Sequence, residues 1–339
     1  MQYAKQQLRR ASPAARELGA WLRQRARALG CDAVGIADPA ARPDRARFER
    51  WVSEGLHAGM DYLARRVALR CDPDLLLPGV RAILCVAVSY HVSRPAPMPK
   101  GPRISRYAWA SDYHPILRAK LHALRSELCA RVPGVRARVA VDTAPLLERH
   151  WAAQAGLGWI GRNGCLIVPG FGSWVFLGEL LCDLPLPADR PVAARCGRCR
   201  RCLEACPTGA LIAPGRLDAR RCIAYWTVEH RGAFSAQTTP PTAPWLFGCD
   251  RCQEVCPGNR GAGETREPAF RRLGPWCAWD TRRWAQLDAA GFARELGGSA
   301  LQRAGLFGVQ RNLRALGDAA RSSAPPRRRD AGTDGDAQG

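Results

Sequence analysis

Seven of the 15 cysteines fall into two groups whose spacing is typical of ligands to iron–sulfur clusters. The first group reads C-x2-C-x2-C-x3-C-P over residues 196–207, and the second reads C-x2-C-x3-C-P over residues 249–257. In bacterial two-cluster proteins, three cysteines of such a run bind one [4Fe-4S] cluster and the fourth binds the other. The sequence therefore predicts two clusters, which transfer electrons one at a time.

The ligands of each cluster follow from this exchange of the fourth cysteine. One cluster is assigned to Cys196, Cys199, Cys202 and Cys256. The second group lacks one cysteine, so the other cluster is assigned, with Cys222 by elimination, to Cys206, Cys222, Cys249 and Cys252. A pair of zinc sites is the alternative, because C-x2-C is also a zinc spacing. The repeated C-x3-C-P favours clusters.

Asp142 is the carboxylate whose position best suits proton transfer. It ends the apolar run at residues 139–141 and precedes a helix expected to begin near Pro145. A carboxyl group half-buried beside apolar neighbours has a raised pKa and can carry a proton to a substrate. The same position also suits a helix N-cap. The spacing alone leaves both roles open.

Two further motifs are incomplete. The G-x-G-x-x-G run at residues 156–161 follows an expected helix and precedes an expected strand, which is the reverse of the dinucleotide-binding order. Its glycines still allow backbone amides to approach another large ligand. Asp112-Tyr-His114 begins like the D-x-H-x-x-G signature of some cobalt-binding proteins, but Leu117 replaces the glycine. His114 is therefore not expected to bind cobalt, and a surface or capping role stays open for it.

The order of the expected elements predicts an α+β fold. Helical patterns cover residues 14–30, 44–68 with breaks at Gly55 and Gly59, 115–131, 145–155 and 283–319. Strand patterns cover residues 32–36, 82–90, 136–141, 165–168 and 173–181. Residues 70–73 are expected to form a loop, because the residue before Pro73 is disfavoured in a helix.

The composition points to a polyanionic partner. The net charge is +21 and is spread along the chain, which favours RNA or DNA over a merely solvated surface. No stretch has the length of a transmembrane helix, and the N-terminal residues lack the apolar run of a signal peptide. We therefore expect no membrane association and a reducing, cytoplasmic location for the thiols.

Several long motifs together resemble those of epoxyqueuosine reductases. The resemblance rests on VDTAPLLER at residues 141–149, AGLGWIGRN at 155–163, GSW at 172–174 and GCDRCQEVCP at 248–257. It extends to RYAWASDYH at residues 106–114 and RNLRALG at 311–317. The resemblance implies an oxidoreductase that reduces epoxyqueuosine to queuosine at the wobble position of tRNA, the last step of queuosine biosynthesis.

The resemblance also implies cofactors and roles. Cobalamin would bind base-off and receive electrons from the two clusters, and Asp142 would donate the proton. The implied cofactor-binding residues are Arg70, Tyr113, Trp159, Gly161, Arg162, Asn163, Ser173, Asp250 and Arg251. Arg162 stands where the family usually has lysine, which keeps the charge and changes its geometry. The implied partners are the anticodon stem-loop of tRNA and an electron donor such as ferredoxin or flavodoxin, with the enzyme a monomer.

The predicted units are a cobalamin-binding mixed α/β domain at residues 10–187 and a ferredoxin-like two-cluster domain at 188–262. A helical segment at 263–320 and a disordered tail at 321–339 follow. A corrinoid reductive dehalogenase acting on a small molecule is the alternative enzyme. Such enzymes usually carry a twin-arginine export signal, which the N-terminal residues do not show. A non-enzymatic electron carrier is the third possibility.

Overall fold

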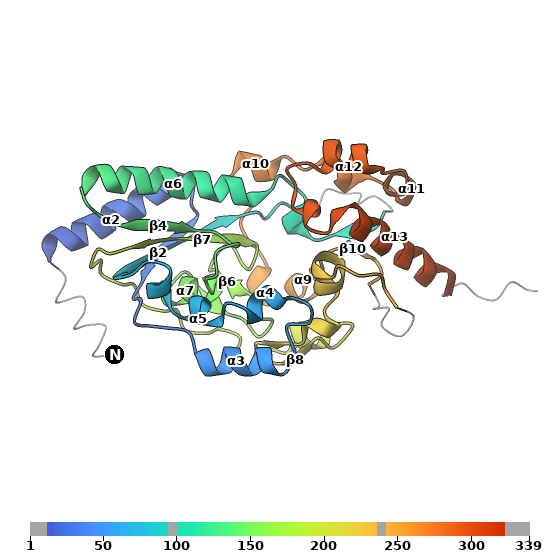
Figure 1. Cartoon of the computed structure of the whole chain (residues 1–339), viewed down its shortest axis with the longest axis horizontal. Helices are drawn as coiled ribbons and strands as arrows, with labels where there is room; N and C mark the ends of the chain where they lie inside the picture. The colour runs from blue at the N-terminus through green and yellow to red at the C-terminus, as the bar shows by residue number, and fades with distance from the viewer. Residues whose placement is uncertain (1–11, 94–100, 236–241, 323–339) are drawn as a thin grey trace, which may run out of the picture.

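The computed structural model describes residues 12–93, 101–235 and 242–322. Its centre is a four-stranded antiparallel sheet in the order β1-β2-β7-β4 (Figure 1). These strands are β1 (Ala33–Ala37), β2 (Ala82–Ser89), β7 (Val175–Cys182) and β4 (Ala137–Ala140). The predicted α+β class is confirmed. Most of the predicted tail lies outside the described residues.

Both faces of the sheet are covered by helices, so its central strands are apolar on both sides. Along β2, Leu84 and Val86 pack into one core, whereas Ile83 and Cys85 pack into the other. This alternation follows from the two-residue period of a strand. The run at residues 82–90 is therefore continuously apolar because both of its faces are buried.

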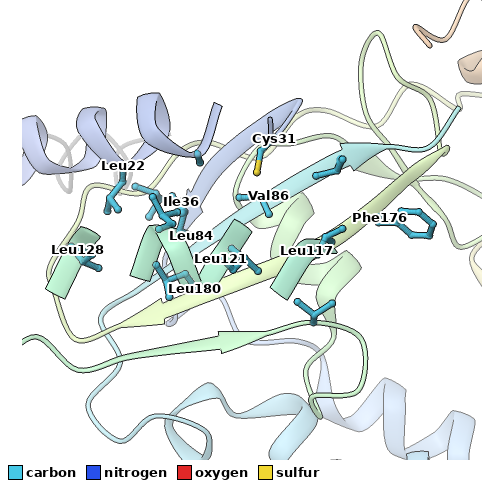
Figure 2. Close-up of a cluster of buried hydrophobic side chains, with 14 of the residues drawn as sticks. Leu22, Cys31, Ile36, Leu84, Val86, Leu117, Leu121, Leu128, Phe176 and Leu180 are labelled. Carbon is cyan, nitrogen blue, oxygen red and sulfur yellow. The ribbon is translucent and has the colours of Figure 1, made fainter. Parts of the chain in front are cut away.

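The first core lies beneath two long helices, α2 (Pro13–Ala28) and α6 (Tyr113–Arg131) (Figure 1). Leu117, Leu121 and Leu128 of α6 point down onto the sheet beside Leu22 of α2 (Figure 2). The other face is covered by α7 (Glu148–Gln154), whose Trp151 is fully buried. The start of α6 and the end of β4 consequently lie close together, and this places the site described below.

The cysteine-rich segment contains short elements only. They are α8 (Arg201–Glu204), β8 (Leu211–Ala213), β9 (Arg216–Leu217), a π-helical turn (Tyr225–Glu229), β10 (Trp245–Phe247) and α9 (Arg251–Glu254). Strand β10 pairs in parallel with β3 (Arg103–Ile104), so this segment is joined to the N-terminal part by backbone hydrogen bonds.

The C-terminal part is helical, as predicted. It comprises α10 (Pro268–Arg271), α11 (Thr281–Ala285), α12 (Ala289–Leu296) and α13 (Gly305–Ser322). Phe270 of α10 packs into the first core, whereas helices α11, α12 and α13 contribute to a third core that also contains Trp109, Val228 and Leu246. All three predicted units therefore share this core, although the exact unit boundaries stay a prediction.

Some predicted boundaries of local elements differ from the structure near turns. Arg70 lies at the end of α5 (Val67–Cys71), so the predicted loop begins only at Asp72. The predicted helix over 44–68 is α3 (Arg45–Ser53) and α4 (Asp61–Ala64), separated by the expected break. The glycine run contains β5 (Trp159–Ile160), which pairs with β6 (Leu166–Ile167). In the described part of the chain, no helix is long and apolar enough to cross a membrane.

Candidate active site and cluster ligands

Asp142 lies in a turn two residues after the end of β4. Its backbone φ is +42°, which is rare for a residue with a side chain. One carboxylate oxygen, Oδ2, is 3.0 Å from Nε2 of His114, and the hydroxyl of Tyr113 also hydrogen-bonds this carboxylate. Both partners belong to the first turn of α6. The site is thus formed where β4 and α6 meet.

His114 is held between two carboxylates. Its Nδ1 is 2.7 Å from Oδ1 of Asp112, the N-cap of α6, and its Nε2 faces Asp142. The hydrogen bonds that His114 donates to these two carboxylates outweigh the effect of burial and raise the pKa of His114 to about 9. At neutral pH the imidazole is therefore protonated and donates to both sides.

Tyr113 is fixed by stacking. Its ring lies between those of His114 and Phe176, with 4.1 Å between centroids on each side. Burial raises the pKa of its hydroxyl, so this group stays protonated and acts as a donor to Asp142.

The pKa of Asp142 is shifted in the direction opposite to the predicted one. Burial acts to raise it, but the hydrogen bonds and charge of His114 and the hydrogen bond from Tyr113 prevail, and the pKa is lowered. The capping alternative is wrong, because α7 begins only at Glu148, and Leu147, its N-cap residue, makes no side-chain capping bond. Residues 145–147 are not helical. Asp142 is therefore a carboxylate that shares a proton with His114.

Cationic and aromatic side chains surround this pair. Arg70 is 9% exposed, stacks on Tyr62 at 5.8 Å, and leaves its Nε without a hydrogen-bond partner among the described residues. Arg303 forms an ion pair with Glu229 at 2.6 Å, and its guanidinium carbon lies 5.7 Å from the centroid of the Tyr62 ring. Tyr62, Arg70 and Arg303 all interact electrostatically with Asp142. The site therefore offers a positive and aromatic surface to a polar ligand.

The four cysteines assigned to one cluster line a single cavity. Cys196, Cys199, Cys202 and Cys256 surround it together with three predicted cofactor-binding residues, Trp159, Arg162 and Asn163. Arg162 donates to the carbonyl of Gly197 at 2.8 Å, which fixes the cluster loop. The structure thus places these three residues against the cluster ligands.

The other four cysteines are also near neighbours. Cys249 lies within electrostatic range of Cys222 and Cys206, and Cys252 lies within range of Cys249 and Cys222. A further thiol, Cys165, lies within electrostatic range of Cys256 in one set and of Cys222 in the other. Within residues 12–93, 101–235 and 242–322, no three such side chains converge on a point that could hold one metal ion. A [4Fe-4S] cluster does not need this, because its ligands bind different iron atoms.

The remaining predicted cofactor-binding residues have other contacts. Ser173 donates to Gln253 at 2.9 Å, and its amide donates to Asn259. Asp250 is buried and accepts hydrogen bonds from Ser105 Oγ and the amide of Arg106. Arg251 is exposed at the start of α9.

Glycines beside β5 allow this strand to lie close to its partner β6. A Cβ at Gly158 would lie 2.1 Å from the carbonyl oxygen of Ile167, and one at Gly161 would lie 2.7 Å from Asn163 Oδ1. These glycines therefore permit close packing of β5 on β6.

Comparison with known families agrees with this arrangement. Residues 195–259 match the 4Fe-4S double cluster binding domain, and residues 70–143 match Epoxyqueuosine reductase QueG, DUF1730. An epoxyqueuosine reductase of Gloeobacter violaceus is 44% identical over 306 residues, covering 88% of this chain and 95% of the relative. The chain belongs to the epoxyqueuosine reductase family. The double-cluster match also decides against the zinc alternative.

Solved structures of epoxyqueuosine reductases have the same fold. One, with an epoxyqueuosine-modified tRNA-Tyr stem loop, is 31% identical with a TM-score of 0.79 and covers 88% of this chain and 80% of its own. Another, from Bacillus subtilis, has an aspartate catalytic loop swung out of the active site; it is 30% identical with a TM-score of 0.82 and covers 88% and 81%. Family membership favours this enzyme over the dehalogenase alternative.

Sequence reasoning missed several residues of this epoxyqueuosine reductase site. It left His114 without a role, although the structure places it between Asp112 and Asp142. The D-x-H spacing was the available signal, because it is also the spacing of an N-cap and a first-turn histidine. Tyr62 and Arg303 gave no signal, since they approach Asp142 only through the tertiary fold.

Proposed function

We propose that this chain reduces epoxyqueuosine to queuosine in tRNA, with cobalamin as cofactor and two [4Fe-4S] clusters as electron relays. The observation that carries the proposal is the proton-sharing pair of His114 and Asp142 in a chain that also brings together two sets of four cysteines. Removal of the epoxide oxygen as water requires two electrons and two protons. The chain has groups suited to supplying both.

Asp142 and His114 would supply one of the two protons, and the other would come from solvent. At neutral pH the shared proton lies on His114, which donates to Asp142. A substrate oxygen that gains negative charge beside Asp142 can take this proton through the carboxylate, while His114 becomes neutral. The hydroxyl of Tyr113 keeps the carboxylate oriented during this transfer. Before this transfer, Asp112 stabilises the protonated imidazole of His114.

Cobalamin is supported by residues that suit its polar periphery. The unpartnered Nε of buried Arg70 offers a donor, and Tyr62 and Tyr113 offer aromatic surface near the acid. When bound, the cofactor would supply the low-valent metal centre for the reduction. Both ring nitrogens of His114 are occupied by carboxylates, so we propose that this histidine is not a cobalt ligand. The base-off form is proposed from the family membership alone. Trp159, Arg162, Asn163 and Ser173 would then contribute from the cluster side.

The proposed partners are the anticodon stem-loop of tRNA and an electron donor such as ferredoxin or flavodoxin. A net charge of +21 suits a polyanionic substrate, and one related structure contains an epoxyqueuosine-modified stem loop. We further propose that the enzyme is monomeric and cytoplasmic, where its thiols stay reduced.

The decisive experiment is anaerobic reconstitution with iron, sulfide and cobalamin, followed by incubation with reductant and tRNA carrying epoxyqueuosine. Queuosine should appear in the digested tRNA, and Asp142→Asn should keep both cofactors and lose most of the turnover. Absence of queuosine from an enzyme with bound cobalamin would refute the proposal. Full activity of Asp142→Asn would refute the role of the acid alone.

A further inference from the structure

The backbone of Asp142 adopts a conformation that its neighbours must maintain. A residue with a side chain at φ +42° is strained and persists only where other contacts hold it in place. The carboxylate is held by His114 and Tyr113. The backbone amide of the same residue donates to Oε1 of Glu148 at 2.5 Å. This second bond acts on the strained backbone itself.

Glu148 is the first residue of α7, so an acidic side chain here has an ordinary explanation. Carboxylates in the first turn of a helix interact favourably with the helix dipole. That explanation does not require a contact with Asp142, six residues earlier. The 2.5 Å bond does connect them, and it crosses from the helix to the turn that carries the acid. Glu148 therefore has a specific partner as well as a favourable location.

A second carboxyl group lies beneath this contact. Glu179 of β7 is fully buried, pairs in register with Ala140 of β4, and has no hydrogen-bond partner for either carboxyl oxygen among the described residues. Burial, together with the charge of Glu148, raises the pKa of Glu179. For Glu148, burial and the charge of Asp142 raise the pKa to about 8, while the hydrogen bond from the Asp142 amide and the charges of Arg149 and His114 act to lower it. Both groups are thus kept from adding charge next to Asp142, and Glu148 remains a neutral acceptor.

We propose that Glu148 is a positioning residue, whose carboxyl oxygen clamps the backbone amide of Asp142 and so keeps its carboxylate on His114. The proposal rests on the proposed function, because it concerns the geometry of the presumed proton donor. Without the clamp, the strained turn relaxes and Asp142 leaves His114. The imidazole then keeps Asp112 as its single carboxylate partner.

Glu148→Met and Glu148→Gln test the clamp. Methionine has a similar volume and no carbonyl acceptor, whereas glutamine keeps the Oε1 acceptor and removes the acid. Glu148→Ala replaces the methionine variant if that variant does not fold. Glu49→Ala is the control, because Glu49 is an exposed acid on α3 with an ion pair to Arg45.

The first measurement needs no turnover. NMR titration of labelled histidines in the cluster-loaded protein follows His114, whose signal is assigned by its loss in His114→Gln. The pKa of His114 should be about 9 in the parent protein. Glu148→Met should lower it by about one unit, because one of two carboxylate partners is lost. Glu148→Gln and Glu49→Ala should leave it unchanged.

The second measurement is turnover on modified tRNA. Glu148→Met should lower kcat by roughly 10- to 100-fold through misplacement of the acid, with KM for tRNA nearly unchanged. Glu148→Gln should restore most of kcat. An unchanged His114 pKa in Glu148→Met, or a glutamine variant as impaired as methionine, would overturn the proposal. If the parent protein makes no queuosine, the proposed function fails, and the NMR titration still decides whether Glu148 holds Asp142.

Discussion

The proton-sharing pair predicts how the reaction depends on pH, and Asp112→Asn probes it. The hydrogen bond that His114 donates to Asp112 is the largest single cause of the raised pKa of His114. Asparagine keeps an acceptor oxygen for the imidazole and is an equally good N-cap for α6. The substitution therefore removes a charge and leaves the local structure in place.

The size of the effect follows from the kind of hydrogen bond that is lost. A bond to a charged group contributes roughly 1.5 kcal/mol more than a bond to a neutral one, which equals about one pKa unit. His114 should then titrate near 8 instead of about 9. A group with a raised pKa keeps its proton until the pH passes that pKa, so activity should fall on the alkaline side. At pH 9 the variant should be roughly fivefold slower than the parent, and near pH 7 the two should be nearly equal.

Single-turnover rates of pre-reduced enzyme on modified tRNA, measured from about pH 6 to 10, provide the assay. Pre-reduction removes the pH dependence of electron supply from the measured rate. Asp280→Asn is the matched control, because Asp280 caps α11 through the amide of Arg283. Its alkaline limb should coincide with that of the parent. A limb that stays near 9 in Asp112→Asn, or a parent enzyme without an alkaline limb, would refute the assignment of the proton to His114.

Three further outcomes are expected. Cys222→Ser should lose one cluster and about half of the bound iron, whereas Cys165→Ala should keep all of it, as iron and sulfide analysis would show. Affinity for tRNA should fall at least about tenfold between roughly 50 and 200 mM salt, and a flat dependence would place the positive charge away from the interface. Lys120→Met should lower the free energy of unfolding by about 3 kcal/mol in a denaturant titration, because it leaves the largely buried Glu267 unpaired; the ion pair measures 2.6 Å.

Local patterns in the sequence were enough to predict much of the fold. The apolar run at residues 82–90 predicted β2 without any tertiary information. The cysteine spacing assigned seven cluster cysteines, and Cys222 was added by elimination, so both ligand sets stay a prediction. The helix expected over residues 145–155 is present as α7, but it begins only at Glu148, because a proline that suits a first helical turn also suits the turn that precedes α7. The prediction of a raised pKa for Asp142 was wrong for a different reason. Its direction depends on His114, which is 28 residues away and is brought close by the packing of α6 beside β4.

Asp250 shows how the cluster segment and the acid are fixed relative to each other. It follows Cys249, a proposed cluster ligand, and its buried carboxylate accepts from Ser105 Oγ and the Arg106 amide, just after β3. The parallel pairing of β3 with β10 adds a backbone connection beside it. The next residue along, Tyr107, lies within electrostatic range of both Asp250 and Asp142. In the proposed reaction, electrons arrive from the cluster side and a proton arrives from the side of Asp142, which requires both sources at a fixed separation. We propose that the buried contacts of Asp250 supply that constraint.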